Sequence, residues 1–255
     1  RNSSAASDVY KRQILEGTEG IWFSVEAVDL DNDGDEDYLF GNLGLNSKFK
    51  ASSKKPLHLF CDDFDKNGTF DIVFSKDYKG ELVPMRGRQC SSEQMPFIAE
   101  KFKNFISFAE ANLQDIMGED KLANALHYQV KTLSSICLLN EGNGNFKEVA
   151  LPRQAQFSPI MDFLNTDIDQ DQNPGIIAIG NLYATEVETT RYDASIGTVL
   201  KYNNTNNSFE VLNNPTTGII IHGDSKDSEI IDVNDHKVIL VTNNDGPLTM
   251  FKINK

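Results

Sequence analysis

The sequence predicts an all-β fold of the β-propeller class, present as part of a ring, with an α-helical insertion at about residues 92–128. Three observations lead to this prediction. An acidic motif recurs along the chain, short apolar runs flank each copy, and Asn/Gly-rich turns join further apolar runs in the manner of β-hairpins. Such repetition, without an alternation of strands and long helices, favours antiparallel sheets arranged radially. An antiparallel β-sandwich is the alternative fold.

The acidic motif reads D-x-D-x-D/N-G-x-x-D and occurs in full at residues 29–37 and 63–71. Hard divalent cations such as Ca²⁺ take about six to eight oxygen ligands, and side chains at alternate positions of a tight loop can converge on one ion. The Gly in each copy allows the sharp turn. Asp, Asn and Gly also cluster in ordinary acidic turns, but two copies with matching flanks favour metal loops.

The motif also resembles the opening of an EF-hand loop, which needs a Glu at its twelfth position and a helix on each side. Phe40 and Phe74 occupy that position here, and the runs after the loops are short, apolar and rich in strand-forming residues. The sequence therefore predicts metal loops that join two strands, and it excludes an EF-hand.

A third copy of the motif, at residues 167–175, keeps Asp167, Asp169 and Asp171 between two apolar runs. Gln172 replaces the Gly, and Gly175 replaces the last Asp. We expect the strand–loop–strand unit here, and the sequence leaves open whether this loop binds a metal.

Blade number follows from chain length, because a propeller blade takes roughly 40–50 residues. The chain has room for about four or five blades, so we expect it to be part of a larger ring or of a longer multidomain protein. Residues 1–13 lack an initiator Met and resemble nothing downstream, so they are interpreted as a disordered leader or an artefact. Residues 14–255 are then expected to form a single propeller domain or a fragment of one.

Apolar residues recur at gaps of three and four between Ser92 and Tyr128. This spacing predicts two amphipathic helices separated near Gly118. We expect a helical insertion that caps one face of the propeller, with a partner-binding helix pair as the alternative.

Composition excludes some classes of function. The net charge is -14, with 38 acidic and 24 basic residues, so a phosphate backbone would be repelled and nucleic-acid binding is not expected. The chain has no apolar run long enough to cross a membrane. Cys61, Cys90 and Cys137 show no metal or redox spacing; buried free thiols are expected for Cys61 and Cys137, and one disulfide stays possible.

The sequence carries no phosphate-binding loop, nucleophile elbow, HExxH or Cys/His pair. The histidines are interpreted as isolated structural residues; they are His58, His127, His222 and His236.

Two polar clusters stand out. One contains Arg86, Arg88 and Glu93, and the other lies within residues 186–193. On one propeller face they would form a carboxylate–arginine pocket for a sugar or peptide. The alternative, which we favour, is ion pairs between blades. The possible ligand face comprises Arg86, Arg88, Glu186, Glu188 and Arg191.

The loops, their flanks and the hairpins resemble the FG-GAP/VCBS repeats of integrin-α-like propellers. Residues 20–25 through 41–51 are similar to the later part of large Bacteroidetes VCBS-repeat surface proteins, many with an adjoining ASPIC/UnbV-type domain. Residues 84–96 and 185–195 are similar to that group too. The resemblance covers most of residues 20–255 and implies a seven-bladed type of propeller, Ca²⁺ in the loops and a secreted or cell-surface role. Members of the group generally lack an assigned reaction.

The resemblance also implies the ligands of each loop. Two sites are expected, and in the third loop only the three Asp match the family motif. The implied ligands are Asp29, Asp31, Asp33, Asp37 and the Asp35 carbonyl in loop one, Asp63, Asp65, Asn67, Asp71 and the Thr69 carbonyl in loop two, and Asp167, Asp169 and Asp171 in loop three.

The expected function is a calcium-binding, non-catalytic propeller module that binds a glycan or protein ligand, or acts as a scaffold, at the bacterial cell surface. Loops of this kind suit millimolar calcium, which favours the cell exterior or envelope. One alternative is a carbohydrate-active enzyme of the polysaccharide lyase type, since propellers with calcium loops can host that chemistry. The other is a structural spacer in a longer chain.

Overall fold

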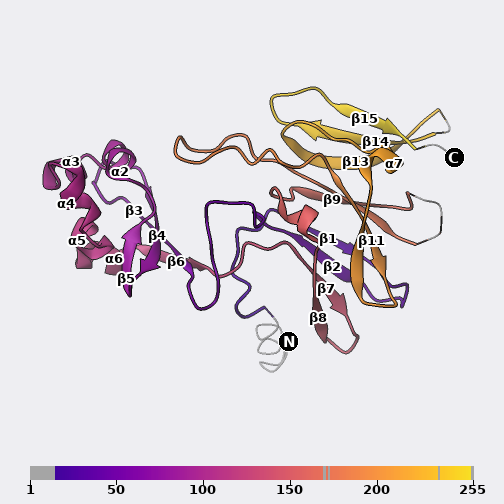
Figure 1. The fold of residues 1–255 in the computed structure, drawn as a ribbon, viewed down its shortest axis with the longest axis horizontal. Coiled ribbons are helices and arrows are strands. Elements are labelled where there is room, and N and C mark those ends of the chain that lie inside the picture. The colour runs from indigo at the N-terminus through magenta and orange to yellow at the C-terminus, as the bar shows by residue number, and fades with distance from the viewer. Residues whose placement is uncertain (1–14, 169–170, 172, 235, 254–255) are drawn as a thin grey trace, which may run out of the picture. The chain divides into compact units, whose positions relative to one another are not determined.

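The computed structural model describes residues 15–168, 171, 173–234 and 236–253, so the expected leader at residues 1–13 lies outside the described part. Backbone contacts divide the chain into two compact units (Figure 1). The three-sheet unit comprises Ile21–Phe49 and Leu133–Lys255. The sheet–helix unit comprises Lys50–Thr132 together with the described residues that precede Ile21. The sequence of the first unit is therefore interrupted by that of the second.

Antiparallel sheets of neighbouring strands build the three-sheet unit. The first sheet has the order β1-β2-β7-β8 and consists of β1 Ser24–Val28, β2 Asp37–Gly41, β7 Ile136–Asn140 and β8 Phe146–Ala150. The second consists of β9 Asp162–Thr166, β10 Gly175–Ile179, β11 Thr198–Asn203 and β12 Ser208–Leu212 in that order. The third consists of β13 Ser225–Val233, β14 His236–Asn243 and β15 Thr249–Lys252. The short helices are η1 Arg153–Gln156 and α7 Asn214–Thr217.

The first strands of these sheets lie next to one another, because β1 packs beside β9 and β9 packs beside β13. The middle strands are the most apolar, and every residue of β10 is buried. Leu39, Ile176 and Leu200 from two sheets are fully buried in one shared core. Each sheet thus packs its apolar face against its neighbour in the same unit.

The sheet–helix unit has one antiparallel sheet of order β5-β4-β3-β6 and a helical layer (Figure 1). The strands are β3 Leu57–Asp62, β4 Asp71–Tyr78, β5 Glu81–Pro84 and β6 Leu126–Val130. The helices are α2 Arg88–Gln94, α3 Phe97–Lys101, α4 Phe105–Ala109, α5 Leu113–Met117 and α6 Glu119–Asn124. Phe60 and Val73 of the sheet share a buried core with Ile98, Leu113 and Ile116 of the helices.

The all-β prediction is confirmed at the level of four antiparallel sheets; the propeller itself stays a prediction. The metal-type loops join β1 to β2, β3 to β4 and β9 to β10, as expected. The predicted hairpins β7–β8 and β11–β12 are also confirmed. Their turns contain Asn143 and Asn207 with left-handed φ of 55° and 52°.

The prediction of two helices over residues 92–128 is wrong in its detail. A break at Gly118 is present, but the helical segment starts at Arg88, consists of five short helices instead of two, and gives way to β6 at Leu126. Pro96 disfavours helix at the preceding residue. Asn104 accepts a hydrogen bond from Ser107 N (2.9 Å) and starts a new helix in the middle of the apolar pattern.

Within the described residues, no helix reaches the length and apolar character needed to span a bilayer. All three cysteines are free thiols; Cys137 is buried as expected, whereas Cys61 is only half-buried.

Candidate metal centres

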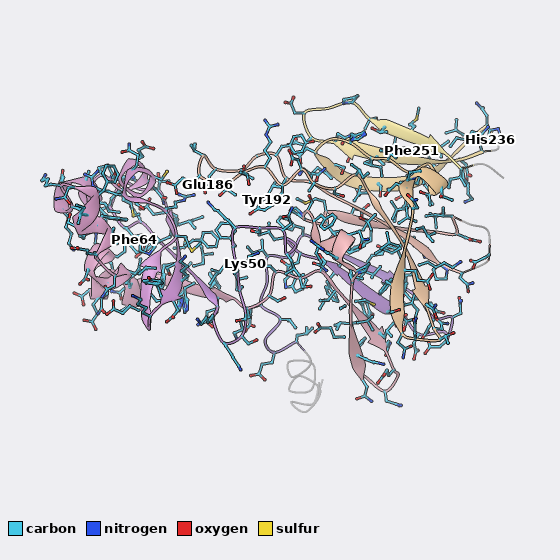
Figure 2. All side chains as sticks on the ribbon, viewed as in Figure 1. Lys50, Phe64, Glu186, Tyr192, His236 and Phe251 are labelled. Atoms are coloured by element: carbon cyan, nitrogen blue, oxygen red, sulfur yellow. The ribbon has the colours of Figure 1, made fainter. Side chains whose placement is uncertain are left out.

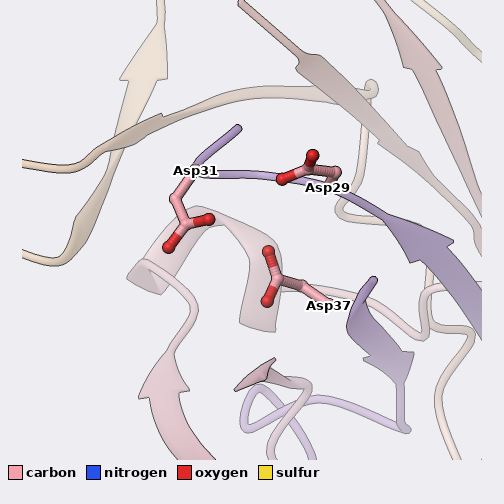
Figure 3. Close-up of side chains that lie close together, drawn as sticks. All are labelled: Asp29, Asp31 and Asp37. Carbon is pink, nitrogen blue, oxygen red and sulfur yellow. The ribbon is translucent and has the colours of Figure 1, made fainter. Parts of the chain in front are cut away.

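Loop one brings three carboxylates together between β1 and β2. Oxygen atoms of Asp29, Asp31 and Asp37 all lie within 4.8 Å of one another. Figure 3 shows the three side chains pointing toward a common space. Asp29 follows the last residue of β1 and Asp37 opens β2, so the sheet fixes both ends of the loop.

Backbone N–H groups hold this loop in a tight turn. Asp29 accepts hydrogen bonds from the N–H of Asp33 (3.1 Å) and of Gly34 (3.0 Å). Asp33 in turn accepts one from Asp35 N (2.9 Å). Asn32 (φ 60°) and Gly34 (φ 95°) adopt the left-handed conformation, which Gly and Asn tolerate best. The motif therefore specifies its own backbone shape.

Asp37 is the buried member of the cluster, with 1% of its surface exposed. It accepts hydrogen bonds from Leu30 N (2.9 Å) and from Asn140 N of β7 (2.8 Å), one on each oxygen. Burial raises the pKa of Asp37, and the two N–H donors oppose this effect. Each carboxylate oxygen still has a lone pair for a metal.

Loop two repeats this frame. Asp63, Asp65 and Asp71 form the second cluster within 4.8 Å. Asp63 accepts from Asn67 N and Gly68 N (both 2.9 Å), and Asp71 accepts from Phe64 N (3.1 Å). The correspondence extends to the left-handed backbone, with φ of 61° at Lys66 and 90° at Gly68.

The two loops differ in the second hydrogen-bond donor to the Asp at position nine of the motif, which is Asp37 in loop one and Asp71 in loop two. Asp71 receives its second hydrogen bond from the side chain of Gln94 on α2 (Nε2 to Oδ1, 3.1 Å) rather than from a backbone N–H. Nothing in the motif pointed to Gln94, because it lies 23 residues further along the chain.

Two of the expected side-chain ligands also take part in the hydrogen bonds of the turn. Asp33 and Asn67 each accept a hydrogen bond from the residue two positions on, Asp35 N and Thr69 N. These hydrogen bonds help to hold the turn, and the ligand role expected of both residues stays a prediction. Asp35 and Thr69, expected to contribute only a carbonyl, are the residues that these bonds fix in place.

Loop three keeps the turn, but a lysine from a neighbouring strand pairs with one of its carboxylates. Asp171 N donates to Asp167 Oδ1 (3.1 Å), as Asp33 N does to Asp29 in loop one. Lys201 of β11 forms an ion pair with Asp171, and this contact holds the pKa of Asp171 below its usual range. Asp169 lies outside the described residues. Among those described, loop three forms no cluster of three carboxylates.

Charge and chemistry decide what loops one and two can hold. Within the described part of the chain, no Lys or Arg pairs with the six clustered carboxylates. Two unit charges about 4 Å apart repel by roughly 1–4 kcal/mol near a protein surface. Consistent with this crowding, burial and then the charge of Asp33 raise the pKa of Asp31. A hard divalent cation fits an all-oxygen donor set of this kind.

The residues of the possible ligand face fall into different units. In the sheet–helix unit, Arg86 Nη1 donates to Gln94 Oε1 (2.8 Å) and Arg88 Nε donates to the Phe102 carbonyl (2.6 Å). Arg88 also lies over the Phe105 ring, 5.3 Å from its centre. These arginines thus contact residues of their own unit.

The other residues of that face lie between β10 and β11, where Figure 2 labels Glu186 and Tyr192. Glu186 forms an ion pair with Lys48 (3.2 Å), whose ammonium also donates to the Glu188 carbonyl (2.7 Å). Arg191 lies over the ring of Tyr183 at 5.1 Å. All of these contacts stay within the three-sheet unit.

The interpretation of the histidines as isolated is wrong for two of them. His58 on β3 and His127 on β6 face each other, with 2.9 Å between Nδ1 and Nε2. The His127 ring also stacks on Phe60, 4.3 Å between centres. Strand pairing joins residues 69 apart in sequence, which motif reading does not reveal.

Comparison with models of protein families gives no match, and comparison with curated proteins gives none. The function is therefore argued from the geometry of the loops.

Proposed function

We propose that this chain is a calcium-binding, non-catalytic β-propeller module of the FG-GAP/VCBS type, which binds a glycan or protein ligand or acts as a scaffold at the bacterial cell surface. The observation that carries the proposal is one hydrogen-bond frame built twice. In each copy three carboxylates converge on a common space with no Lys or Arg of the described residues paired to them. A divalent cation would remove the repulsion that this arrangement creates.

Calcium is the ion that best suits the donors. The three clustered side chains of each loop are carboxylates, and neither cluster includes a Cys or His that would favour zinc. Irregular loops between strands adapt to the variable geometry that Ca²⁺ accepts, whereas Mg²⁺ demands a near-ideal octahedron.

The arrangement of the three-sheet unit supports the propeller. Its sheets follow one another along the chain, and their first strands β1, β9 and β13 lie side by side. Radially arranged blades place their first strands together in this way. Metal-type loops join the first two strands of the first and second sheets of this unit, as expected if the motif belongs to the blade rather than to one site.

An extracellular role would suit calcium loops with the affinity typical of extracellular modules. Loops of extracellular modules bind with dissociation constants of about 10⁻⁴–10⁻³ M. At about 10⁻⁴ M, millimolar calcium stabilises the folded state by roughly 1.4 kcal/mol per site. Such sites would be filled outside the cell.

The test is a calorimetric calcium titration of the full chain and three variants. We expect at least two bound ions in the wild type and one fewer in Asp31→Ala and in Asp65→Ala. Asp35→Asn is the matched control, because this residue is expected to offer only its carbonyl. An unchanged stoichiometry in Asp31→Ala would overturn the assignment of loop one.

The non-catalytic part of the proposal has a separate test. The arginines and carboxylates of the possible ligand face have partners within their own units. We expect no unsaturated product when the calcium-loaded chain is incubated with acidic polysaccharides. Product formation would contradict the non-catalytic proposal and favour the lyase alternative.

A further inference from the structure

The helical layer of the sheet–helix unit reaches loop two through side chains that have no counterpart in loop one. In loop one the ninth residue, Asp37, is held by the backbone N–H of Asn140. In loop two the equivalent oxygen of Asp71 is held by the Gln94 amide at 3.1 Å. Gln94 is the last residue of α2, so the candidate ligand is tied to a helix.

The orientation of this amide is fixed from its other side. Arg86 Nη1 donates to Gln94 Oε1 at 2.8 Å, so the oxygen of the amide faces the guanidinium. The Nε2 group must then face Asp71, where it also approaches the Ile72 carbonyl at 3.4 Å. Arg86 and Gln94 therefore point an N–H donor at the carboxylate.

A second connection runs from α6 to the same loop. The Lys121 ammonium donates to the Phe64 carbonyl (2.7 Å) and lies 4.1 Å from the centre of the Phe97 ring. Phe64, the second residue of loop two, is 2% exposed and belongs to the core that the helices share (Figure 2). The loop is thus part of the packing of the helical layer.

We propose that Gln94 is a positioning residue for the second metal loop, and that an ion bound there orders the helical layer formed by α2–α6. This inference rests on the proposed calcium binding. Its physical basis is that none of these helices exceeds seven residues, and helices that short are not stable without tertiary contacts. An ion that fixes Asp71 also fixes the acceptor on which Gln94, and with it the end of α2, depends.

Partners of liganding carboxylates affect metal affinity in a known range. Removing one typically weakens binding by about 10–100-fold. Gln94→Leu keeps a side chain of similar size but no donor. We expect calcium affinity at loop two to fall about tenfold, with affinity at loop one unchanged because Asp37 uses a backbone N–H.

The experiment combines calcium calorimetry with hydrogen exchange of the full chain, measured with millimolar calcium and with chelator. In the wild type, we expect calcium to slow exchange several-fold in loop one, in loop two and in α2. In Gln94→Leu, loop two should still respond at saturating calcium, while α2 should not. Gln94→Glu, which keeps the size of the side chain but offers no donor at neutral pH, should behave in the same way.

Gln89→Leu is the matched control, because Gln89 lies on the same helix and is exposed, and among the contacts described its side chain bonds only to Glu93. It should match the wild type. Calcium-dependent protection of α2 that persists in both Gln94 variants would overturn the inference. Unchanged hydrogen exchange of α2 in the wild type, when an ion is bound in loop two, would also overturn it. If no ion binds at all, the proposed function fails, and this inference fails with it.

Discussion

Ser75 on β4 is buried with 0% exposure, yet its hydroxyl has no hydrogen-bond partner among the described residues. A buried hydroxyl without a partner costs about 1–3 kcal/mol. We therefore expect Ser75→Ala to keep or raise the free energy of unfolding, by up to about 1 kcal/mol, in urea denaturation. Ser135→Ala is the control, because that equally buried hydroxyl accepts a hydrogen bond from Asn42 N (2.9 Å). A loss at Ser75 as large as that at Ser135 would contradict the prediction.

Residues of the metal loops could be predicted because their geometry is local. Asp29 and Asp63 accept hydrogen bonds from N–H groups four and five positions ahead, so the spacing of the motif is enough to predict the turn. Partners from distant elements could not be predicted. Gln94 reaches loop two from a helix, and Lys201 neutralises Asp171 of loop three from a neighbouring hairpin.

Elements in the three-sheet unit meet closely at Gly41, the last residue of β2. A Cβ atom at this position would collide with Ser24 Oγ and with the Ile160 carbonyl oxygen. Ser24 itself donates a hydrogen bond to that carbonyl (3.0 Å), so the contact ties β1 to the segment before β9. We expect Gly41→Ala to lower the free energy of unfolding by about 1–3 kcal/mol through overpacking.

The Gly41 prediction is checked by chemical denaturation of the single variant and of Ser24→Ala/Gly41→Ala. Removing the Ser24 hydroxyl should not restore stability, because the backbone carbonyl of Ile160 still blocks the methyl group. Full recovery in the double variant would mean that the Ser24 side chain alone limits the space.

Element types were predictable where short-range signals are strong. The Asn/Gly turns at Asn143 and Asn207 mark hairpins because few residues accept a left-handed backbone. The helix boundaries of the helical layer were harder to predict. The apolar spacing runs on without a gap, although single capping residues divide the segment into short helices. Asn112, for example, starts α5 through a reciprocal capping box with Asp115, which interrupts no apolar pattern.

At the scale of the whole three-sheet unit, acidic groups gather where the first strands meet. Burial, then the charges of Asp162 and Glu229, raise the pKa of Glu26 on β1. Burial, then the charge of Asp227, raises the pKa of Asp162 on β9, although Ser228 donates hydrogen bonds to it. This crowding is a property of the assembled sheets, because the residues come from β1, β9 and β13.

These pKa shifts predict a pH dependence. The folded-state pKa of Asp162 exceeds its unfolded value of about 3.9. At a pH between these two values, the folded state holds a proton that the unfolded state has released. Stability therefore falls as pH rises from about 4 through the raised folded value. Asp162→Asn should reduce this fall in calcium-free unfolding measurements at pH 4–7. Asp232→Asn, at an exposed site on β13, controls for the loss of one charge; equal slopes in the wild type and Asp162→Asn would contradict the prediction.

The two units each contain one complete cluster, loop one in the three-sheet unit and loop two in the sheet–helix unit. Separate compact units commonly unfold in separate transitions. We therefore expect chelation to lower two calorimetric transitions, and about 1.4 kcal/mol at a filled site corresponds to roughly 3–10 °C depending on the size of the unit.

Two variants show which unit gives rise to each transition. Asp31→Ala should remove the calcium dependence of the transition of the three-sheet unit alone, and Asp65→Ala that of the sheet–helix unit alone. Loop two should respond at higher calcium, because Asn67 replaces one carboxylate of the motif and charge count sets affinity. Both variants acting on one shared transition would show that the units unfold together, and that calcium at either loop stabilises the chain as one cooperative structure.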